Sequence, residues 1–177
     1  MRAWIPIWLP VLLLSLSAAS LASAALALDP TGEWETEKGD AHIRIVDCGG
    51  KLWGVVSWAK IPGYDVHNPD PSLRSRPTVG MPVLLNMKPG DDPGTWEGEV
   101  YNAKNGRTYD ASIEIQSADT LHVEGCTLAV LCGGEDWKRL VQSQPAQTQP
   151  GNSAGTTGAT ASAATADICA SVAGRPH

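Results

Sequence analysis

The sequence lacks any excess of positive charge. Its 13 Lys and Arg residues stand against 19 Asp and Glu residues, which gives a net charge of -6. Proteins that bind nucleic acid, or that are drawn to anionic lipid, normally carry a surplus of basic residues. We therefore expect neither nucleic acid nor anionic lipid as a partner.

The sequence also lacks a catalytic constellation. Catalysis requires a nucleophile beside a base, paired carboxylates or clustered metal ligands. The four His residues are scattered: His42 and His122 fall on outward positions of expected strands, His67 lies in a long loop, and His177 is the last residue. No glycine-rich phosphate loop lies between a strand and a helix. These absences predict a protein that is not an enzyme and uses no cofactor.

A metal site is not expected either. Asp65, His67, Asn68 and Asp70 place oxygen and nitrogen ligands in one loop, but their spacing is not that of a Ca²⁺-binding loop. Asn and Asp are common beside Pro in turns, because their side chains bond to the local backbone. Turn formation therefore explains these residues without a cation.

The N-terminal region has the layout of a secretory signal peptide. An uncharged, mostly apolar run at 4–16 follows Met1 and Arg2, and small residues fill 17–27. A membrane-spanning helix needs about 20 apolar residues. The A-x-A sequence at 25–27 offers a cleavage site, with the sequence at 22–24 as the alternative. We expect a signal peptide over 1–27, a periplasmic or secreted protein, and no stable membrane span after cleavage. Retention as an N-terminal anchor is the alternative.

The C-terminal region has almost no large apolar residues. Ser, Ala, Thr, Gly, Gln and Pro dominate residues 142–177, and such a segment buries too little surface to offset its ordering entropy. We expect a disordered tail there. One domain then remains, over 28–141.

Within this domain, apolar and polar residues alternate. Tyr109, Ala111, Ile113 and Ile115 are separated by polar residues, so one face of the strand is buried and the other is wet. Similar segments predict eight strands, at 32–37, 41–47, 51–60, 80–87, 95–102, 107–116, 120–125 and 136–141. Short links, several with Gly, favour an antiparallel up-and-down meander. We expect an all-β, eight-stranded closed barrel, because closure removes exposed edges; two packed sheets are the alternative.

The long connection at 61–79 interrupts the meander. Pro71 opens a short helical turn and Pro77 ends it, with Arg74 and Arg76 between them. Two Arg residues above a barrel mouth would clamp a carboxylate or phosphate in bidentate fashion. The alternative is that they pair with the surplus carboxylates or bond to loop carbonyls.

The first predicted strand carries a short motif. Gly32, Glu33 and Trp34 resemble the G-x-W motif of lipocalins and related calycin barrels, in which the Trp caps one end of the barrel and an Arg of the last strand packs over it. Arg139 is placed for that part here. The resemblance implies a lipocalin-like barrel closed at one end by Gly32, Trp34 and Arg139.

A broader resemblance covers most of the domain. It is carried by DPTGEW at 29–34, CGGKL at 48–52, NPDPSLRSRP at 68–77, Tyr101, GRTY at 106–109, GC at 125–126, CGG at 132–134 and Trp137. These segments resemble a bacterial exported family known as domain of unknown function 2147. The resemblance implies a lipocalin-like barrel with no established biochemical role. The sequence departs from that family at Trp53, where a second Cys is usual, so a family-wide disulfide scheme is not carried over.

Four Cys residues in an exported chain favour disulfides over a metal site, and three pairings exist. Cys126 and Cys132 would lie about 20 Å apart on an extended strand, so they can bond only if the segment between them curls. Cys48 lies where the second and third strands meet, at the end of the barrel from which the tail leaves. We expect Cys126–Cys132 and Cys48–Cys169 disulfides. The alternative leaves Cys169 free or uses it to join two chains.

The first functional hypothesis is storage of one small apolar or amphipathic ligand in the barrel. Small inward residues would leave space for it: Thr36, Ala41, Gly98, Ala111 and Gly125. Large inward residues would compete for the same space: Trp34, Trp96, Tyr109, Ile113 and Ile115. The candidate ligand-binding residues are Arg74, Arg76, Tyr101, Tyr109 and Trp96.

The second hypothesis is a cell-envelope module that binds protein or glycan through the 61–79 loop. Exposed aromatic residues would take part, with Trp58, Tyr64 and Tyr101 as candidates. Trp53 and Trp58 are out of phase on one strand, so at least one of them should face outward.

Overall fold

The computed structural model describes residues 29–127, 131–140 and 157–173. The signal peptide predicted at 1–27 lies outside these residues. Within them, eight strands form one sheet that closes on itself. The strands are β1 (Gly32–Glu35), β2 (Ala41–Asp47), β3 (Leu52–Ala59), β4 (Pro82–Pro89), β5 (Thr95–Asn102), β6 (Arg107–Ser117), β7 (Thr120–Thr127) and β8 (Leu131–Arg139). A 3₁₀ turn, η1 (Pro71–Leu73), and a helix, α1 (Thr157–Val172), complete the described elements.

Every strand is antiparallel to the next, and β1 pairs with β8 through Trp34 and Arg139. The closed eight-stranded meander predicted from the sequence is therefore confirmed. The alternation that predicted it also builds the interior: inward positions of five strands carry fully buried side chains at Trp34, Ile45, Leu84, Met87, Ile113 and Leu121.

Trp34 and Arg139 seal one end of the barrel. The guanidinium carbon of Arg139 lies 4.1 Å from the centre of the Trp34 ring. Its nitrogens donate to the carbonyls of Asp29, Thr31 and Ala118 at 2.6 to 2.8 Å. Gly32 leaves room for this, because a Cβ there would lie 2.9 Å from Arg139 Nη1.

Strand β8 begins at Leu131 and not at 136 as predicted. Residues 131–135 read LCGGE, which has neither alternation nor β-branched residues. Pairing with β7 still extends along the whole segment and places Cys126 opposite Cys132. Their disulfide crosses the two strands with a Cα–Cα distance of 4.0 Å. Antiparallel pairing of β7 with β8 thus brings the two Cys residues together.

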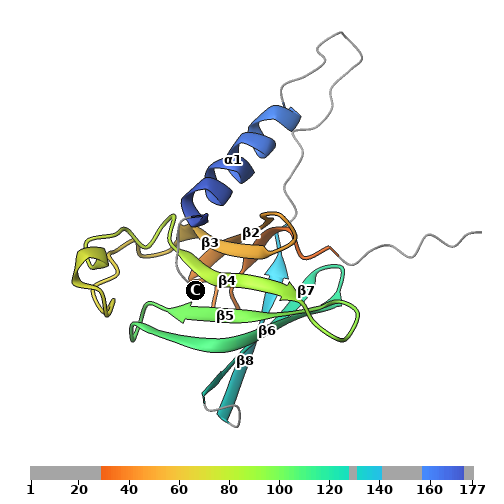
Figure 1. Cartoon of the computed structure of the whole chain (residues 1–177), viewed down its shortest axis with the longest axis horizontal. Helices are drawn as coiled ribbons and strands as arrows, with labels where there is room; N and C mark the ends of the chain where they lie inside the picture. Colours follow the sequence, from red (N-terminus) through yellow and green to blue (C-terminus); the bar gives the residue numbers. More distant parts are fainter. Residues whose placement is uncertain (1–28, 128–130, 141–156, 174–177) are drawn as a thin grey trace, which may run out of the picture.

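Helix α1 forms within the segment for which the sequence predicts disorder. The helix is rich in Ala, which has the highest helix propensity. It lies against β2 and β3 on the outside of the barrel (Figure 1). There Val172 packs on Val46 and Trp53, and Cys169 forms a disulfide with Cys48. Both disulfides join the pairs expected from the sequence.

Trp53 and Trp58 both lie on the outer face of β3. A register shift beside His42 and Ile43 changes the phase of the strand between them. Trp58 then stacks on His42 with ring centres 4.5 Å apart and stays 43% exposed. Trp53 lies under α1. The position where the family pattern has a Cys thus supplies part of the seat for the helix.

Candidate functional site

The barrel is filled at one end and hollow at the other. The hollow part is a cavity of about 1060 Å³ that opens among the β1–β2, β3–β4 and β5–β6 connections, beside the end of β7 at Thr127 and the start of β8 at Leu131. Its wall includes the apolar side chains of Ile43, Val56, Met81, Val83, Val100, Val123 and Trp137. Pockets that bind small molecules have volumes of about 300–1,000 Å³ and are mostly apolar. The cavity therefore has the size and lining of a ligand site.

Small inward residues explain where the space lies. Thr36, Ala41 and Gly125 line the cavity, as expected for residues that leave room. Gly98 and Ala111 do not line it. A Cβ on Gly98 would lie 2.7 Å from the Met87 sulfur, so Met87 has filled the space that Gly98 leaves. The interior is thus solid beside Trp34 and hollow toward the opposite end.

Most polar side chains of the cavity wall already have partners. Asp40 accepts from Thr36 Oγ1 at 2.8 Å and pairs with Lys104 Nζ at 3.3 Å. The hydrogen bond from Thr36, with help from Lys104, lowers the Asp40 pKa against the opposing effect of burial. Tyr109 Oη accepts from Asn105 Nδ2 at 2.7 Å. The wall can therefore surround an apolar body while its polar groups stay satisfied at the rim.

Two cationic groups at the rim differ from the rest. Lys38 and Lys60 line the opening, and neither side chain has a polar partner among the described residues. The Lys60 backbone N–H donates to the Asp40 carbonyl, which holds the β1–β2 turn beside β3. The sequence interpretation missed both lysines, because isolated Lys residues near turns carry no spacing signal.

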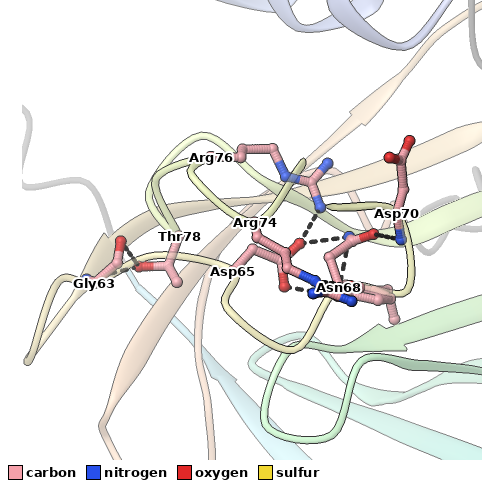
Figure 2. A network of polar contacts seen from close by, with 8 residues as sticks. Gly63, Asp65, Asn68, Asp70, Arg74, Arg76 and Thr78 are labelled. Carbon is pink, nitrogen blue, oxygen red and sulfur yellow. Dashed lines mark hydrogen bonds and ion pairs between the residues drawn. The ribbon is translucent and has the colours of Figure 1, made fainter. Parts of the chain in front are cut away.

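The 61–79 loop is held to the barrel by a buried polar network. Asp65 is fully buried and accepts from Tyr101 Oη at 2.6 Å, Asn68 Nδ2 at 2.7 Å and Arg76 Nη2 at 2.6 Å. Figure 2 shows Asp65, Asn68 and Arg76 pointing toward one another inside the loop. We call this network the loop clasp. Its members are Asp65, Asn68, Arg76 and Tyr101.

The loop clasp shifts two pKa values. Burial would raise the pKa of Asp65, but the hydrogen bonds from Tyr101, Asn68 and Arg76 together outweigh it and lower that pKa. Burial raises the pKa of Tyr101 to about 12, and the hydrogen bond to the Asp65 carboxylate acts in the same direction. Both shifts favour the states in which Asp65 is charged and Tyr101 is neutral.

The two Arg residues serve the loop. Arg74 Nε donates to the Asn68 carbonyl at 2.8 Å, and Arg76 pairs with Asp65. Neither residue lines the cavity. The arrangement corresponds to the alternative in which these residues bond to a loop carbonyl and to a carboxylate, so they are not placed to clamp a ligand there.

The aromatic candidates divide differently. Tyr101 and Tyr109 line the cavity. Trp96 packs at the edge of the filled core and does not line the cavity. Tyr101 is buried beneath the loop, so it is not one of the exposed aromatics that the second functional hypothesis required. Trp58 and Tyr64 are exposed.

Among the described residues, Glu124, Cys126 and Cys132 bring three potential metal ligands within 4.8 Å of one another. The two sulfurs are joined in a disulfide and so are not thiolate ligands. The described helices include none that is long and apolar enough to cross a membrane.

Comparison with known proteins places this barrel in a family. The model of a family described as "Uncharacterized protein conserved in bacteria", DUF2147, matches residues 32–139, from the first strand to the last. The chain belongs to the DUF2147 family. A search of curated proteins gave no match.

The DUF2147 barrel also resembles a solved structure, that of protein HP1028 from Helicobacter pylori, which is described as belonging to the lipocalin family. The TM-score is 0.59 at 20% sequence identity, and the match covers 65% of this chain and 85% of HP1028. The similarity shows the lipocalin-like fold predicted from the G-x-W motif.

Proposed function

We propose that this DUF2147 protein binds one small apolar or amphipathic molecule in the hollow half of its barrel. The cavity of about 1060 Å³, with its apolar wall and open mouth, carries the proposal. Burying the apolar part of a ligand there would contribute roughly 25 cal/mol for each Å² removed from water. A polar end would lie at the mouth, beside Lys38 and Lys60.

We further propose that the protein works outside the cytoplasm. Two disulfides, Cys48–Cys169 and Cys126–Cys132, support this, because disulfides persist in oxidising compartments. The signal-peptide layout of residues 1–27 supports the same proposal.

The binding test fills the cavity without touching its rim. Val100 is half-buried and lines the cavity, whereas Glu97 on the same strand is exposed. Val100→Trp should abolish uptake of N-phenyl-1-naphthylamine, a dye whose fluorescence rises in apolar surroundings. Glu97→Trp is the matched control, since it adds the same side chain outside the barrel.

Urea denaturation shows that each variant is folded before the dye is added. The proposal fails if the folded wild-type protein takes up no dye and no co-purifying lipid or metabolite is found by native mass spectrometry. It also fails if Val100→Trp and Glu97→Trp bind the dye equally well.

A further inference from the structure

The mouth of the cavity carries the most exposed apolar side chains among the described residues. Ile61 is 86% exposed, Leu131 70%, Tyr64 64% and Val66 58%. All four also line the cavity. Single exposed apolar residues are ordinary on a protein surface, but several at one opening indicate contact with an apolar partner.

These residues come from two separate parts of the chain. Ile61, Tyr64 and Val66 belong to the loop after β3, and Leu131 begins β8 at the β7–β8 hairpin. The loop and the hairpin both project from the body of the barrel (Figure 1). We call these four residues the mouth tips.

The loop clasp gives the tips on the loop a fixed place. Asp65 lies between Tyr64 and Val66 in the sequence and is bonded to Tyr101 of β5 at 2.6 Å. Because the fully buried, hydrogen-bonded Asp65 is the residue between them, Tyr64 and Val66 are held in a fixed position rather than on a loose segment. The apolar side chains are therefore presented outward by a rigid support.

The charge at the mouth is also specific. Asp40 is paired with Lys104, Glu135 accepts from the Trp137 indole, and Asp65 is paired with Arg76. Asp40 and Asp65 are thus paired with cations, and Glu135 is bonded but keeps its charge. The ammonium groups of Lys38 and Lys60 have no polar partner among the described residues. The opening therefore presents apolar tips flanked by free ammonium groups.

From these observations we infer that the mouth docks on the surface of a phospholipid bilayer, with the mouth tips inserted and Lys38 and Lys60 at the level of the phosphates. Apolar side chains with flanking Lys residues are the pattern of interfacial membrane contact. Separate tips on two connections suit a fluid bilayer, whereas a folded partner would need a matching rigid shape. The net charge of -6 means that insertion, and not bulk attraction, drives the contact.

Docking would place the cavity opening directly against lipid. The cavity could then exchange an amphipathic ligand with the bilayer without exposing its apolar part to water. This loading role rests on the proposed ligand-binding function, but docking itself does not.

The test measures co-sedimentation of the purified protein with phosphatidylcholine vesicles. Wild-type protein should sediment with them, and raising the salt concentration should change this little. Ile61→Ser with Leu131→Ser should weaken sedimentation at least tenfold, because two large apolar side chains are no longer available to leave water on insertion. Lys38→Gln with Lys60→Gln should weaken sedimentation with these zwitterionic vesicles less than the loss of the two tips does.

Trp58→Ser is the matched control. Trp58 is a large exposed side chain on the outer face of β3 and does not line the opening. The variant should sediment like the wild type. Equal losses in Trp58→Ser and in the mouth-tip variant would overturn the inference, as would a wild-type protein that stays in the supernatant. A mouth-tip variant that changes only the oligomeric state in gel filtration would assign the tips to a contact between copies and also overturn it.

Dye uptake separates docking from ligand binding. Val100→Trp should lose the dye and keep its vesicle binding. If Val100→Trp takes up dye normally while the mouth-tip variant fails to sediment, docking stands and the cavity proposal falls.

Discussion

The hydroxyl of Tyr101 is the group on which the loop clasp can be tested most directly. It donates to Asp65 Oδ1 at 2.6 Å and accepts from Asn68 Nδ2 at 3.1 Å. Tyr101→Phe removes the hydroxyl and keeps the ring. A hydrogen bond to a charged group contributes about 1.5–3 kcal/mol, so the variant should lose about 2 kcal/mol of unfolding free energy at pH 7.

The same residue predicts how this loss depends on pH. Burial and the Asp65 carboxylate raise the Tyr101 pKa from 10.0 to about 12 in the folded protein. The folded state therefore favours the neutral phenol, and the resulting stability is fully present below pH 10 and is lost as the pH rises toward 12. Linkage gives a loss of about 1.4 kcal/mol by pH 11 and about 2.7 kcal/mol in all.

Urea denaturation at pH 7, 9, 10 and 11 measures both effects. The stability gap between wild type and Tyr101→Phe should narrow by about 1.4 kcal/mol between pH 7 and pH 11. Tyr64→Phe is the control, because Tyr64 is 64% exposed. The unfolding free energy of this variant should stay close to that of the wild type from pH 7 to pH 11. A Tyr101→Phe gap that is constant up to pH 11 would refute the assignment of the raised pKa to the clasp.

Three further substitutions test other contacts. Gly106→Ala should destabilise the protein by about 2 kcal/mol or more and speed proteolysis of the 61–79 loop. The reason is that the Gly106 φ is 68° and the new Cβ would lie 1.9 Å from the His67 carbonyl oxygen. A wild-type cleavage rate would contradict this contact. Arg139→Lys keeps the charge but loses the planar group that bonds three carbonyls, so the thermal midpoint should fall by several degrees. Opening the longer disulfide with Cys169→Ser should cost about 5 kcal/mol in urea denaturation, against about 2 for Cys132→Ser, since the sequence separations are 121 and 6; equal losses would argue against the chain-entropy origin.

The strands were predictable because each has a solvent-exposed face and a buried face, which makes polar and apolar residues alternate along the sequence. The ranges for β2 and β5 agree with the structure at both ends, at 41–47 and 95–102. The start of β8 was not predictable from alternation. Its Cys and Gly residues pair along β7 through backbone hydrogen bonds, which any residue except Pro can make.

The helix was missed because a segment rich in small residues is compatible both with a helix and with disorder. The Ala content of α1 favours a helix, while the absence of large apolar residues indicates a chain with no core of its own. What stabilises α1 is packing of Val172 against Val46 and Trp53 and the bond from Cys169 to Cys48. Only the Cys of the tail hinted at that attachment.

The bonding partners of Arg74 and Arg76 could also not be predicted from the sequence. The residue pattern placed Arg74 and Arg76 in a Pro-rich loop with nearby carboxylates, and a ligand clamp and an internal bond were both compatible with it. The choice depends on the direction of each guanidinium, which follows from the burial of Asp65 eleven residues before Arg76. The position of the cavity was likewise decided by packing, since Met87 fills the space beside Gly98, whereas Gly125, with Val100 against it, lines the cavity.

The division of the barrel into a solid half and a hollow half separates two kinds of evolutionary constraint. Substitutions beside Trp34 disturb close packing, which determines whether the chain folds at all. Substitutions of half-buried residues around the cavity, such as Val100, alter a surface that is already partly empty and so cost less in folding stability. Under the proposed binding function, such a scaffold would gain new ligands through changes at its hollow end while its packed end stays constant.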